Sequence, residues 1–558
     1  MTSVSTIPDD MRQTMGELFL DRADDDSTAL LFEDDRWSYR ELVVEAARRS
    51  AVLQELRPEG KPWHVGVLLE NTPEYIFLLA GASLSGATIV GINPTRRGDE
   101  LAKDIRGTDV DIILVDDAFA DLLEGIDHGA RQVIRVDGDE WKSLLEKHAD
   151  APIEATPEAL DPAFKLVLLF TSGSTGAPKA VICSTGRWAR VTQVTIFNFT
   201  PEDVAYNAMP LFHGNALMSA WSPAIHARAA LAMRRKFSAS GFLPDIQKFN
   251  VTFFNYVGRS LAYVLAQPEG PEEADNRLRF GFGTEASAKD RAEFLRRFGC
   301  QVFESYGSSE GACYIINNAD TPEGALGVPQ VGHHPEIVNA AGEVCPPAEF
   351  DANGVLLNSE EAIGEIVSRD AAGMFEGYYK NPEAAAEKLR DGDFWTGDLG
   401  YRDKEGYFWY AGRTADWLRV DSENFSAAPV ERILARYPGV TVAAVYGVPD
   451  PRTGDLVMAT LQLAPGADDV DPRDFAAFLS EQPDLGTKWA PTLLRITRNL
   501  PVTATNKVDK PTLRRQRWNT TDTVYRRTDG VYELLDEPAL EKLLTEYDEH
   551  GRRNLVTS

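Results

Sequence analysis

The sequence predicts an α/β protein with a large N-terminal domain of doubly wound sheets and a small α+β C-terminal domain. Its 558 residues, 43% hydrophobic and 26% charged, are enough for several cores of an ordinary globular chain. Short apolar segments alternate with amphipathic ones along most of the chain, which favours parallel sheets with both faces covered. Near residue 412 this pattern gives way to a shorter α+β set. We therefore place the two domains at residues 1–412 and 413–558.

The alternation is clearest in the first 260 residues. Residues 75–92 run for 18 positions without a charge, the lower limit for a membrane-spanning helix, but Gly86 divides them into a helix and a strand. We therefore expect no membrane span. The expected strands are HVGVLLE, TIVGIN, DIILVDD, RQVIRVD, LVLLFTSG and TFFNYVG, and the expected helices are EYIFLLAGASLS, DELAKDIRG and DEWKSLLEKH.

In the C-terminal part, a strand GYFWYAGR ends at residue 413 and the α+β set follows it directly. Its helices are VERILARYP and FAAFLSEQ, and its strands are VTVAAVYGVPD and VMATLQLAPG. No Pro/Ser-rich linker separates the two parts, which favours a short hinge.

Charge and cysteine content exclude several classes of function. A net charge of −29 disfavours nucleic acid as a partner, because phosphates require Lys/Arg stripes. The four cysteines form no C-x-x-C pair, so neither a zinc site nor a disulfide framework is expected. The adjacent His333 and His334 lack a third ligand at suitable spacing and predict no metal site. We expect a cytoplasmic protein; peripheral membrane contact and the oligomeric state stay open.

The segment LLFTSGSTGAPKAV places a turn rich in glycine and hydroxyl groups directly after a strand. A Walker loop requires G-x-x-x-x-G-K-[ST], yet Pro178 stands at its second glycine and Ala180 follows Lys179, so a P-loop NTPase is excluded. Exposed backbone N–H groups, hydroxyls and the Lys179 charge can still hold phosphate oxygens. The candidate nucleotide-binding residues here are Thr171, Ser172, Gly173, Ser174, Thr175, Gly176 and Lys179.

This loop resembles the nucleotide loop of the adenylate-forming (acyl-activating) family, and four further family motifs follow it in order. They are YGSSE at 306–310 for Y-G-x-T-E, TGD at 396–398, GRTAD at 412–416 for G-R-x-D-D, and PVTATNK at 501–507 for P-x-T-x-x-G-K. The resemblance thus spans most of the chain. It implies activation of a carboxylic acid by ATP, followed by rotation of a mobile C-terminal domain.

The resemblance also implies a role for individual residues. Lys507 would contact the carboxylate and the α-phosphate, Glu310 would bind Mg²⁺, and Thr171 completes the catalytic set. Tyr306 would lie against adenine, and Asp398 would accept hydrogen bonds from the ribose hydroxyls. The rest of the implied nucleotide site consists of Ser305, Gly307, Ser308, Ser309 and Arg413.

Other segments indicate the acyl acceptor and the acid. VYGVPDPRTGD resembles a segment of CoA ligases, and no carrier domain is visible in the short stretch after Lys507, so coenzyme A is the expected acceptor. RRKFSAS, NYVG, FEGYYKNPEAAAEK and VYRRTDGVYELLDEPALEKL resemble the fatty-acid-transport and very-long-chain acyl-CoA synthetase branch, which includes actinobacterial sterol side-chain CoA ligases. The expected substrate is a long-chain, very-long-chain or sterol side-chain acid, and the sequence does not choose among them.

By family position, the acyl pocket would involve His213, Tyr256 and Gly283, and the CoA tunnel Ser422, Glu423 and Asn424. Three positions depart from the family: Ala415 replaces a hinge acid, Ser422 replaces a glycine beside the tunnel, and Asn506 replaces a glycine. Two alternatives therefore stay open. One is an adenylating enzyme that loads a separate carrier protein, and the other is a non-catalytic member of the family.

Overall fold

The computed structural model describes residues 11–171, 179–194, 196–257, 260–284, 286, 288–318, 320–351, 356–413, 417–420, 423–452, 455–467, 469–482, 485–486, 488–503 and 507–556. The chain forms two compact units. The first contains Met1–Asn318, Pro329–His334 and Arg369–Phe394, and the second contains Ala319–Val328, Pro335–Ser368 and Trp395–Ser558. The domain boundary between residues 412 and 413 stays a prediction.

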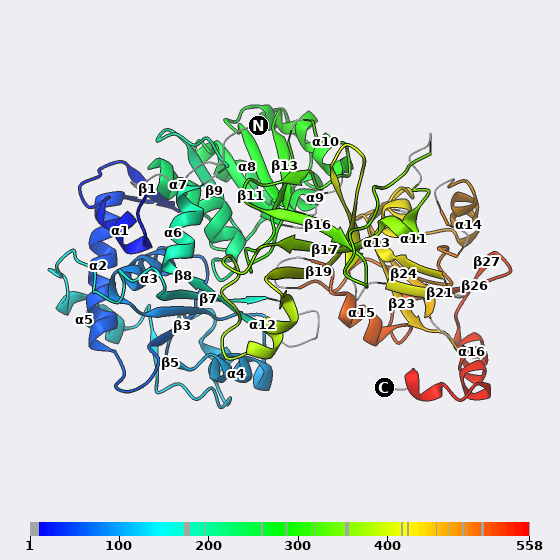
Figure 1. Ribbon diagram of the computed structural model, residues 1–558, viewed down its shortest axis with the longest axis horizontal. Helices are drawn as coiled ribbons and strands as arrows, with labels where there is room; N and C mark the ends of the chain where they lie inside the picture. Colours follow the sequence, from blue (N-terminus) through cyan, green and yellow to red (C-terminus); the bar gives the residue numbers. More distant parts are fainter. Residues whose placement is uncertain are drawn as a thin grey trace. The chain divides into compact units, whose positions relative to one another are not determined.

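The first unit contains a six-stranded sheet in the order β6-β5-β3-β4-β7-β8 (Figure 1). All neighbouring strands are parallel except β7 and β8, which form an antiparallel pair. The parallel sheet inferred from the sequence is thus confirmed. The strands are β3 (His64–Leu68), β4 (Thr88–Gly91), β5 (Val110–Val115), β6 (Gln132–Arg135), β7 (Lys165–Thr171) and β8 (Lys179–Ser184).

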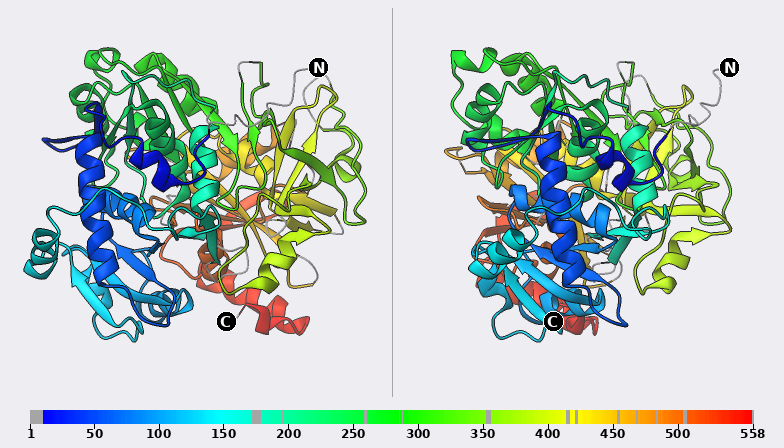
Figure 2. Two further views of the ribbon diagram at one scale, coloured as in Figure 1. Left: turned by 60° about the vertical axis from the view of Figure 1, so that its left-hand side comes forward. Right: turned by 90° about the vertical axis from the view of Figure 1, so that its left-hand side faces the viewer.

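Helices cover both faces of this sheet. Successive side chains of a strand point to opposite faces, and here Ile112 and Ile113 on β5 accordingly belong to two different apolar clusters. One cluster joins the sheet to α2 (Tyr39–Glu55) and α3 (Pro73–Ser85), and the other joins it to α4 (Gly98–Gly107). Figure 2 shows α2 as the long blue helix of this layer.

The uncharged run at 75–92 is divided as predicted, since α3 ends at Ser85 and β4 begins at Thr88. Among the described residues, no helix has both the length and the apolarity needed to cross a membrane.

A second sheet of the first unit includes β14-β13-β12-β11-β9-β10-β1-β2 in that order. Its central strands, from β1 to β13, run parallel, so their carboxyl ends meet at one edge. In α/β sheets that edge is where ligands bind. The strands are β1 (Thr28–Phe32), β2 (Asp35–Ser38), β9 (Val204–Asn207), β10 (Ala230–Met233), β11 (Phe253–Val257), β12 (Phe280–Thr284), β13 (Gln301–Tyr306) and β14 (Ile315–Ile316).

The remaining elements of the first unit are mostly helices that pack on these two sheets (Figure 1). They are α1 (Met15–Leu20), α5 (Asp139–Lys147), α6 (Thr185–Gln193), the π-helix η2 (Ala216–Trp221), α7 (Ser222–Ala227), α8 (Ala239–Lys248), α9 (Ser260–Leu265), α10 (Ala288–Phe298), α12 (Pro382–Lys388) and the short strand β18 (Leu389–Arg390).

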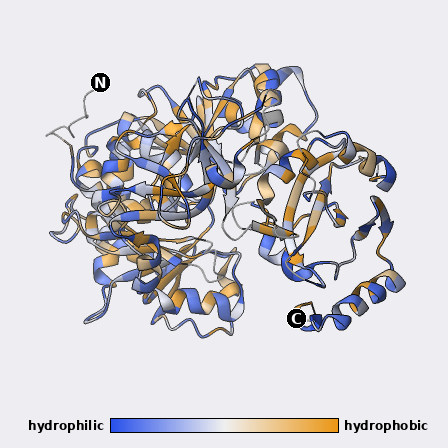
Figure 3. Ribbon diagram, turned by 45° about the vertical axis from the view of Figure 1, so that its right-hand side comes forward, coloured by the Kyte–Doolittle hydropathy of each residue, from blue (hydrophilic) through white to orange (hydrophobic). Residues whose placement is uncertain are grey.

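The second unit confirms the predicted α+β set after residue 412. Its sheet β23-β24-β25-β26-β27 carries α13 and α14, and its core strands are apolar while α16 is largely hydrophilic (Figure 3). The elements are β16 (His334–Val338), α11 (Ser359–Ala362), β17 (Gly364–Arg369), β19 (Asp393–Arg402), β20 (Phe408–Arg413), β21 (Trp417–Val420), β22 (Glu423–Ser426), α13 (Ala427–Leu434), β23 (Val440–Pro449), β24 (Asp455–Leu463), α14 (Pro472–Ser480), β25 (Leu493–Thr497), α15 (Lys510–Gln516), β26 (Thr523–Thr528), β27 (Val531–Leu534) and α16 (Glu537–Glu549).

Candidate active site

The predicted phosphate-binding loop connects the two antiparallel strands β7 and β8. Thr171 is the last residue of β7 and pairs with Lys179, the first residue of β8; the Thr171 hydroxyl lies 3.4 Å from the Lys179 carbonyl oxygen. A P-loop instead connects a strand to a helix, so the topology agrees with the exclusion made from the sequence. Ser172, Gly173, Ser174, Thr175 and Gly176 lie outside the described residues.

The segment 375–380 runs alongside this hairpin and pairs with β8. The Tyr379 backbone N–H donates to the Ala180 carbonyl oxygen at 2.8 Å. The Glu376 carboxylate accepts hydrogen bonds from the Ser184 backbone N–H at 2.7 Å and from its hydroxyl at 2.5 Å. Because both ends of the segment are attached to β8, the intervening Tyr378 is held beside the start of that strand.

Tyr378 connects the hairpin to the YGSSE motif. Its hydroxyl donates to Glu310 Oε1 at 2.8 Å, and Lys179 Nζ lies 5.2 Å from the centre of its ring. All three side chains are buried. Burial and the nearby Glu310 charge raise the pKa of the Tyr378 hydroxyl, so it stays a neutral donor. The structure thus brings Lys179 and Glu310, two predicted site residues, to the same aromatic ring.

The backbone that precedes Glu310 is held by a buried arginine. Arg187, on α6, donates from its guanidinium to the Ser309 carbonyl oxygen at 2.5 Å and to the Ile182 carbonyl oxygen at 3.1 Å. Gly311 follows with φ +73, and a Cβ there would meet the guanidinium itself. A side chain at position 311 would be strained at this φ and would clash with Arg187, so the position requires glycine. The backbone is thus constrained on both sides of Glu310.

The other motif residues of the first unit lie at the end of β13. Ser305 and Tyr306 are its last two residues and pair with β14, while Gly307 and Ser308 are exposed. This is the carboxyl-end edge of the parallel strands, where ligands are expected.

His213 lies next to the same loop. It is half-buried, and its ring packs on Phe212 with the ring centres 4.4 Å apart. A Cβ on the neighbouring Gly214 would be 3.6 Å from the Ser309 hydroxyl oxygen, so this segment lies against the YGSSE motif. The π-helix η2 begins three residues after His213, and π-helices frequently occur at functional sites.

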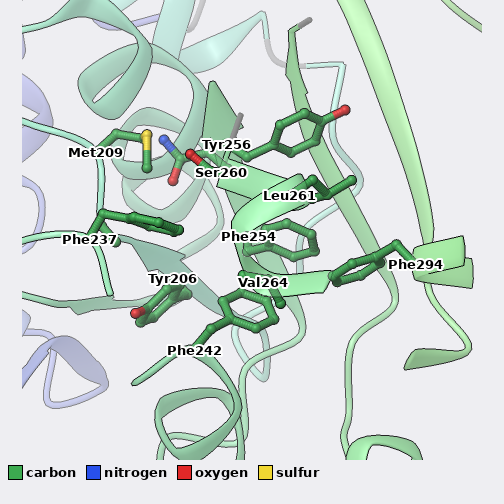
Figure 4. A pocket seen from close by; sticks show the side chains of 12 residues that line it. Tyr206, Met209, Phe237, Phe242, Phe254, Tyr256, Ser260, Leu261, Val264 and Phe294 are labelled. Atoms are coloured by element: carbon green, nitrogen blue, oxygen red, sulfur yellow. The ribbon is translucent and has the colours of Figure 1, made fainter. Parts of the chain in front are cut away.

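A pocket lined mainly by aromatic and aliphatic side chains includes Met209, four residues before His213, and Tyr256 (Figure 4). The Tyr256 hydroxyl reaches Glu304 Oε1 at 3.3 Å, and Glu304 directly precedes Ser305 on β13. The apolar pocket therefore adjoins the strand that carries the nucleotide motif. Its lining consists of Tyr206, Ala208, Met209, Phe237, Phe242, Phe254, Asn255, Tyr256, Ser260, Leu261, Val264 and Phe294.

In this conformation the pocket is nearly filled by its own side chains. Its cavity is about 10 Å³, which is close to the minimum for a single water molecule. The rings of Phe242, Phe254 and Phe294 pack closely (Figure 4). The Phe242 and Phe254 rings meet edge-on with centres 5.2 Å apart, and the Phe254 and Phe294 rings are tilted with centres 5.3 Å apart. Any larger ligand requires these rings to move.

Gly283 makes room for the Tyr256 ring on the neighbouring strand, and its predicted role at the acyl pocket stays a prediction. It pairs with Tyr256 across β11 and β12, and a Cβ there would lie 2.6 Å from Tyr256 Cγ. The Tyr256 carbonyl oxygen would be closer still. A side chain at Gly283 therefore has to displace both the ring and the neighbouring strand.

We expect Gly283→Ala to lower stability and activity together. Overpacking of this kind costs about 1–3 kcal/mol, and the displaced Tyr256 ring would narrow the pocket. Thermal unfolding and turnover with a long-chain acid measure the two effects. Gly373→Ala is the matched control, because Gly373 is exposed and a Cβ there meets nothing within 4 Å. Equal unfolding temperatures and equal turnover in Gly283→Ala and Gly373→Ala would contradict the role of Gly283 in accommodating the Tyr256 ring.

In the second unit, Asp398 and Arg413 occupy paired backbone positions on neighbouring strands. They are paired residues of the antiparallel strands β19 and β20, although their motifs are separate in sequence. The turn before Asp398 is fixed by Thr396, whose hydroxyl donates to the Ile366 carbonyl oxygen at 2.7 Å and accepts from the Asp398 N–H at 3.1 Å. Two residues that are predicted to contact the nucleotide are thus neighbours on this sheet.

Lys507 closes a short loop of the second unit. The Thr503 backbone N–H donates to the Lys507 carbonyl oxygen at 2.7 Å. The adjacent residues Val502 and Val508 form an antiparallel β-bridge. For the predicted CoA tunnel, Glu423 and Asn424 lie on β22, which pairs with β21. Ser422 and two other positions that depart from the family, Ala415 and Asn506, lie outside the described residues.

The residues present fit a magnesium ion that is shared with a nucleotide. Among the residues that the structure describes, no three His, Cys, Asp or Glu side chains form a ready-made metal cage. Mg²⁺ usually binds through one or two carboxylates plus substrate phosphates, so the buried Glu310, which shares the Tyr378 side chain with Lys179, is a suitable ligand.

Three residues of this site were not predicted from the sequence, namely Tyr378, Arg187 and Glu376. Tyr378 and Glu376 lie in FEGYYKNPEAAAEK, a segment that indicates the branch of the family without assigning a role to its individual residues. Arg187 carried no signal, because its partner Ser309 is distant in the sequence.

Comparisons with known proteins agree with this geometry. Residues 20–379 match the AMP-binding enzyme family, and residues 429–507 match the AMP-binding enzyme C-terminal domain. The chain is 48% identical over 554 residues to steroid-22-oyl-CoA synthetase of Rhodococcus jostii (strain RHA1), covering 98% of this chain and 99% of that protein. It is 44% identical over 500 residues to the medium/long-chain-fatty-acid–CoA ligase FadD17 of Mycobacterium tuberculosis (strain ATCC 25618 / H37Rv). This alignment covers 89% of this chain and 95% of that protein.

Among solved structures, ATP-bound MatB from Rhodopseudomonas palustris superimposes with a TM-score of 0.77 at 26% identity. The alignment covers 90% of this chain and 98% of MatB. Family matches of this length, together with the ordered motifs and the site at the β7–β8 hairpin, show that the chain belongs to the AMP-binding, adenylate-forming enzymes.

Proposed function

We propose that this protein is an ATP-dependent acyl-CoA ligase that activates a steroid side-chain acid or a long-chain fatty acid. The acid is first converted to an acyl-adenylate with release of pyrophosphate. The coenzyme A thiol then attacks the acyl carbonyl, the acyl–phosphate bond breaks, and AMP leaves as the thioester forms. The observation that carries the proposal is the buried Glu310–Tyr378–Lys179 group at the β7–β8 hairpin. It adjoins an apolar pocket through the Tyr256–Glu304 contact.

The chemistry requires charge neutralisation, because a carboxylate has to approach the anionic α-phosphate. The Lys179 ammonium neutralises charge on the phosphates. The Lys507 ammonium neutralises charge on the reacting carboxylate and on the α-phosphate oxygens. Tyr306 lies against adenine, and Asp398 accepts hydrogen bonds from the ribose. Glu310 would hold Mg²⁺, which when bound neutralises the charge of the phosphates.

The pocket favours a bulky apolar acid. Flat rings such as Phe254 and Phe294 can slide apart to admit a fused-ring or straight-chain group, whereas the lining offers almost no polar surface to a charged or polar tail. His213 follows the pocket residues Ala208 and Met209 in the sequence and neighbours Gly214, which lies against the YGSSE motif; it would contact the acyl chain near its carboxylate. We also propose that the enzyme works in the cytoplasm, where ATP and coenzyme A are available.

The test is one incubation of the protein with ATP, Mg²⁺ and a panel of acids, with and without coenzyme A. The panel contains a steroid-22-oic acid and fatty acids from medium to very long chain. We expect pyrophosphate release with every accepted acid and thioester only when coenzyme A is present. We expect kcat/KM to be highest for the steroid acid, by about tenfold, or roughly 1.4 kcal/mol in transition-state binding.

The remaining outcomes separate the alternatives. Acyl-AMP that accumulates with coenzyme A present, without a thioester, would identify an enzyme that loads a carrier protein. Absence of pyrophosphate with every acid would identify a non-catalytic member of the family. A preference for straight chains over the steroid acid would reject the steroid assignment and leave the ligase activity standing.

A further inference from the structure

We propose that Tyr378 is a positioning residue that holds the Glu310 carboxylate in the orientation needed for Mg²⁺ and keeps Lys179 from pairing with it. The inference rests on the proposed function, because it gives Glu310 the role of a metal ligand.

The phenol hydroxyl fixes one oxygen of the carboxylate. It donates to Glu310 Oε1 at 2.8 Å, and Tyr378 is only 5% exposed, so water does not compete for this bond. Arg187 already holds the backbone at Ser309. With the backbone held, Glu310 moves mainly by rotation about its side-chain bonds. The hydrogen bond from the Tyr378 hydroxyl restricts that rotation. Groups that hydrogen-bond to a metal ligand in this way orient it and tune its affinity.

The face of the same ring holds the lysine. Lys179 Nζ lies 5.2 Å from the ring centre, a distance at which an ammonium is attracted to the π-electrons. Among the described residues, no ion pair joins Lys179 to Glu310, although both are buried at this site. The cation lies over the face of the ring and the carboxylate lies at its hydroxyl edge, so each keeps its charge available.

This separation matters because a buried lysine and a buried glutamate otherwise attract each other strongly. An ion pair between them would neutralise the two charges that the site needs for separate purposes. The carboxylate is needed for a cation, and the ammonium for phosphate oxygens. A tyrosine satisfies both groups without joining them.

Tyr378→Phe isolates the hydroxyl, because phenylalanine keeps the ring that faces Lys179. ATP binding is measured by calorimetry without acid or coenzyme A, once in EDTA and once in excess Mg²⁺. The ratio of the two affinities reports the coupling between metal and nucleotide. We expect this ratio to fall about tenfold in Tyr378→Phe, within the 10–100-fold range typical for loss of such a partner, while the affinity in EDTA stays unchanged.

Tyr379→Phe is the matched control. It removes a hydroxyl from the next residue, but that hydroxyl donates to Asp109, and we expect its Mg²⁺ coupling to equal that of the wild type. A double variant tests the route of the effect: in a Glu310→Gln background, Tyr378→Phe should cause no further loss of coupling. The unfolding temperatures of all variants show whether a loss reflects misfolding.

Three results would overturn the inference. They are unchanged coupling in Tyr378→Phe, a further loss of coupling when Tyr378→Phe is added to Glu310→Gln, and an equal loss in Tyr379→Phe. Since the assay contains no acid and no coenzyme A, its result is independent of which acid the enzyme activates. A wild-type protein that binds ATP without any help from Mg²⁺ would instead contradict the metal role of Glu310 in the proposed function.

Discussion

Lys507→Ala is expected to slow formation of the acyl-adenylate about a hundred- to a thousandfold. The lysine charge meets the carboxylate and the α-phosphate only while the two anions are being joined. Removing a preorganised contact of this kind commonly costs about 3–4 kcal/mol. The family match to the C-terminal domain ends at Lys507, whose carbonyl oxygen accepts a hydrogen bond from the Thr503 backbone N–H.

The second half-reaction should be much less affected, since the adenylate has then already formed. Pyrophosphate release measures the first step, and single-turnover transfer from preformed acyl-AMP to coenzyme A measures the second. Lys542→Ala, which removes an exposed lysine of α16 in the same unit, should leave both rates at the wild-type level. If Lys507→Ala slowed both half-reactions equally, the role assigned to this lysine would be wrong.

Much of the fold followed from local patterns in the sequence. The run at 75–92 separated correctly into α3 and β4, because a glycine interrupts it and a β-branched segment follows. The α+β set after residue 412 was likewise confirmed through α13, β23, β24 and α14. Periodicity and turn residues are local signals, so they sufficed for these elements.

The site was only partly accessible from the sequence. Motifs named Asp398 and Arg413 separately, but their pairing across β19 and β20 depends on the register of two strands. Tyr378 was missed as a site residue because its partner Glu310 is 68 positions away, and Arg187 because Ser309 is 122 positions away. Such contacts arise from tertiary packing, which no local pattern encodes.

Gly283 illustrates the same limit. Family position implies a place at the acyl pocket, and the structure adds a contact that no motif predicts, in which Gly283 accommodates the Tyr256 ring through strand pairing. The closed state of the pocket was also beyond the sequence, because it depends on how rings such as Phe242 and Phe254 fill a common space.

Glu310→Gln is expected to lower Mg²⁺-dependent turnover on the order of a hundredfold, or about 2.7 kcal/mol. The amide keeps the shape of the carboxylate and can still accept a hydrogen bond from Tyr378. It lacks the negative charge that a hard cation requires from its ligand. The loss should be greatest at limiting Mg²⁺ and partly recovered at high Mg²⁺, because a weakened site fills when the metal is raised.

The fold should not suffer from this substitution. Glu310 is 9% exposed, and a neutral amide is less costly to bury than a carboxylate, so the unfolding temperature should stay equal or rise. Glu273→Gln is the informative comparison. Glu273 is also buried, but its carboxylate accepts a hydrogen bond from Arg297 Nε at 2.8 Å and has a structural role, so its loss should reduce stability without changing the Mg²⁺ dependence. Wild-type turnover of Glu310→Gln at limiting Mg²⁺ would reject Glu310 as the metal ligand. A metal-dependent loss in Glu310→Gln but not in Glu273→Gln would show that the loss does not follow from removing any buried carboxylate.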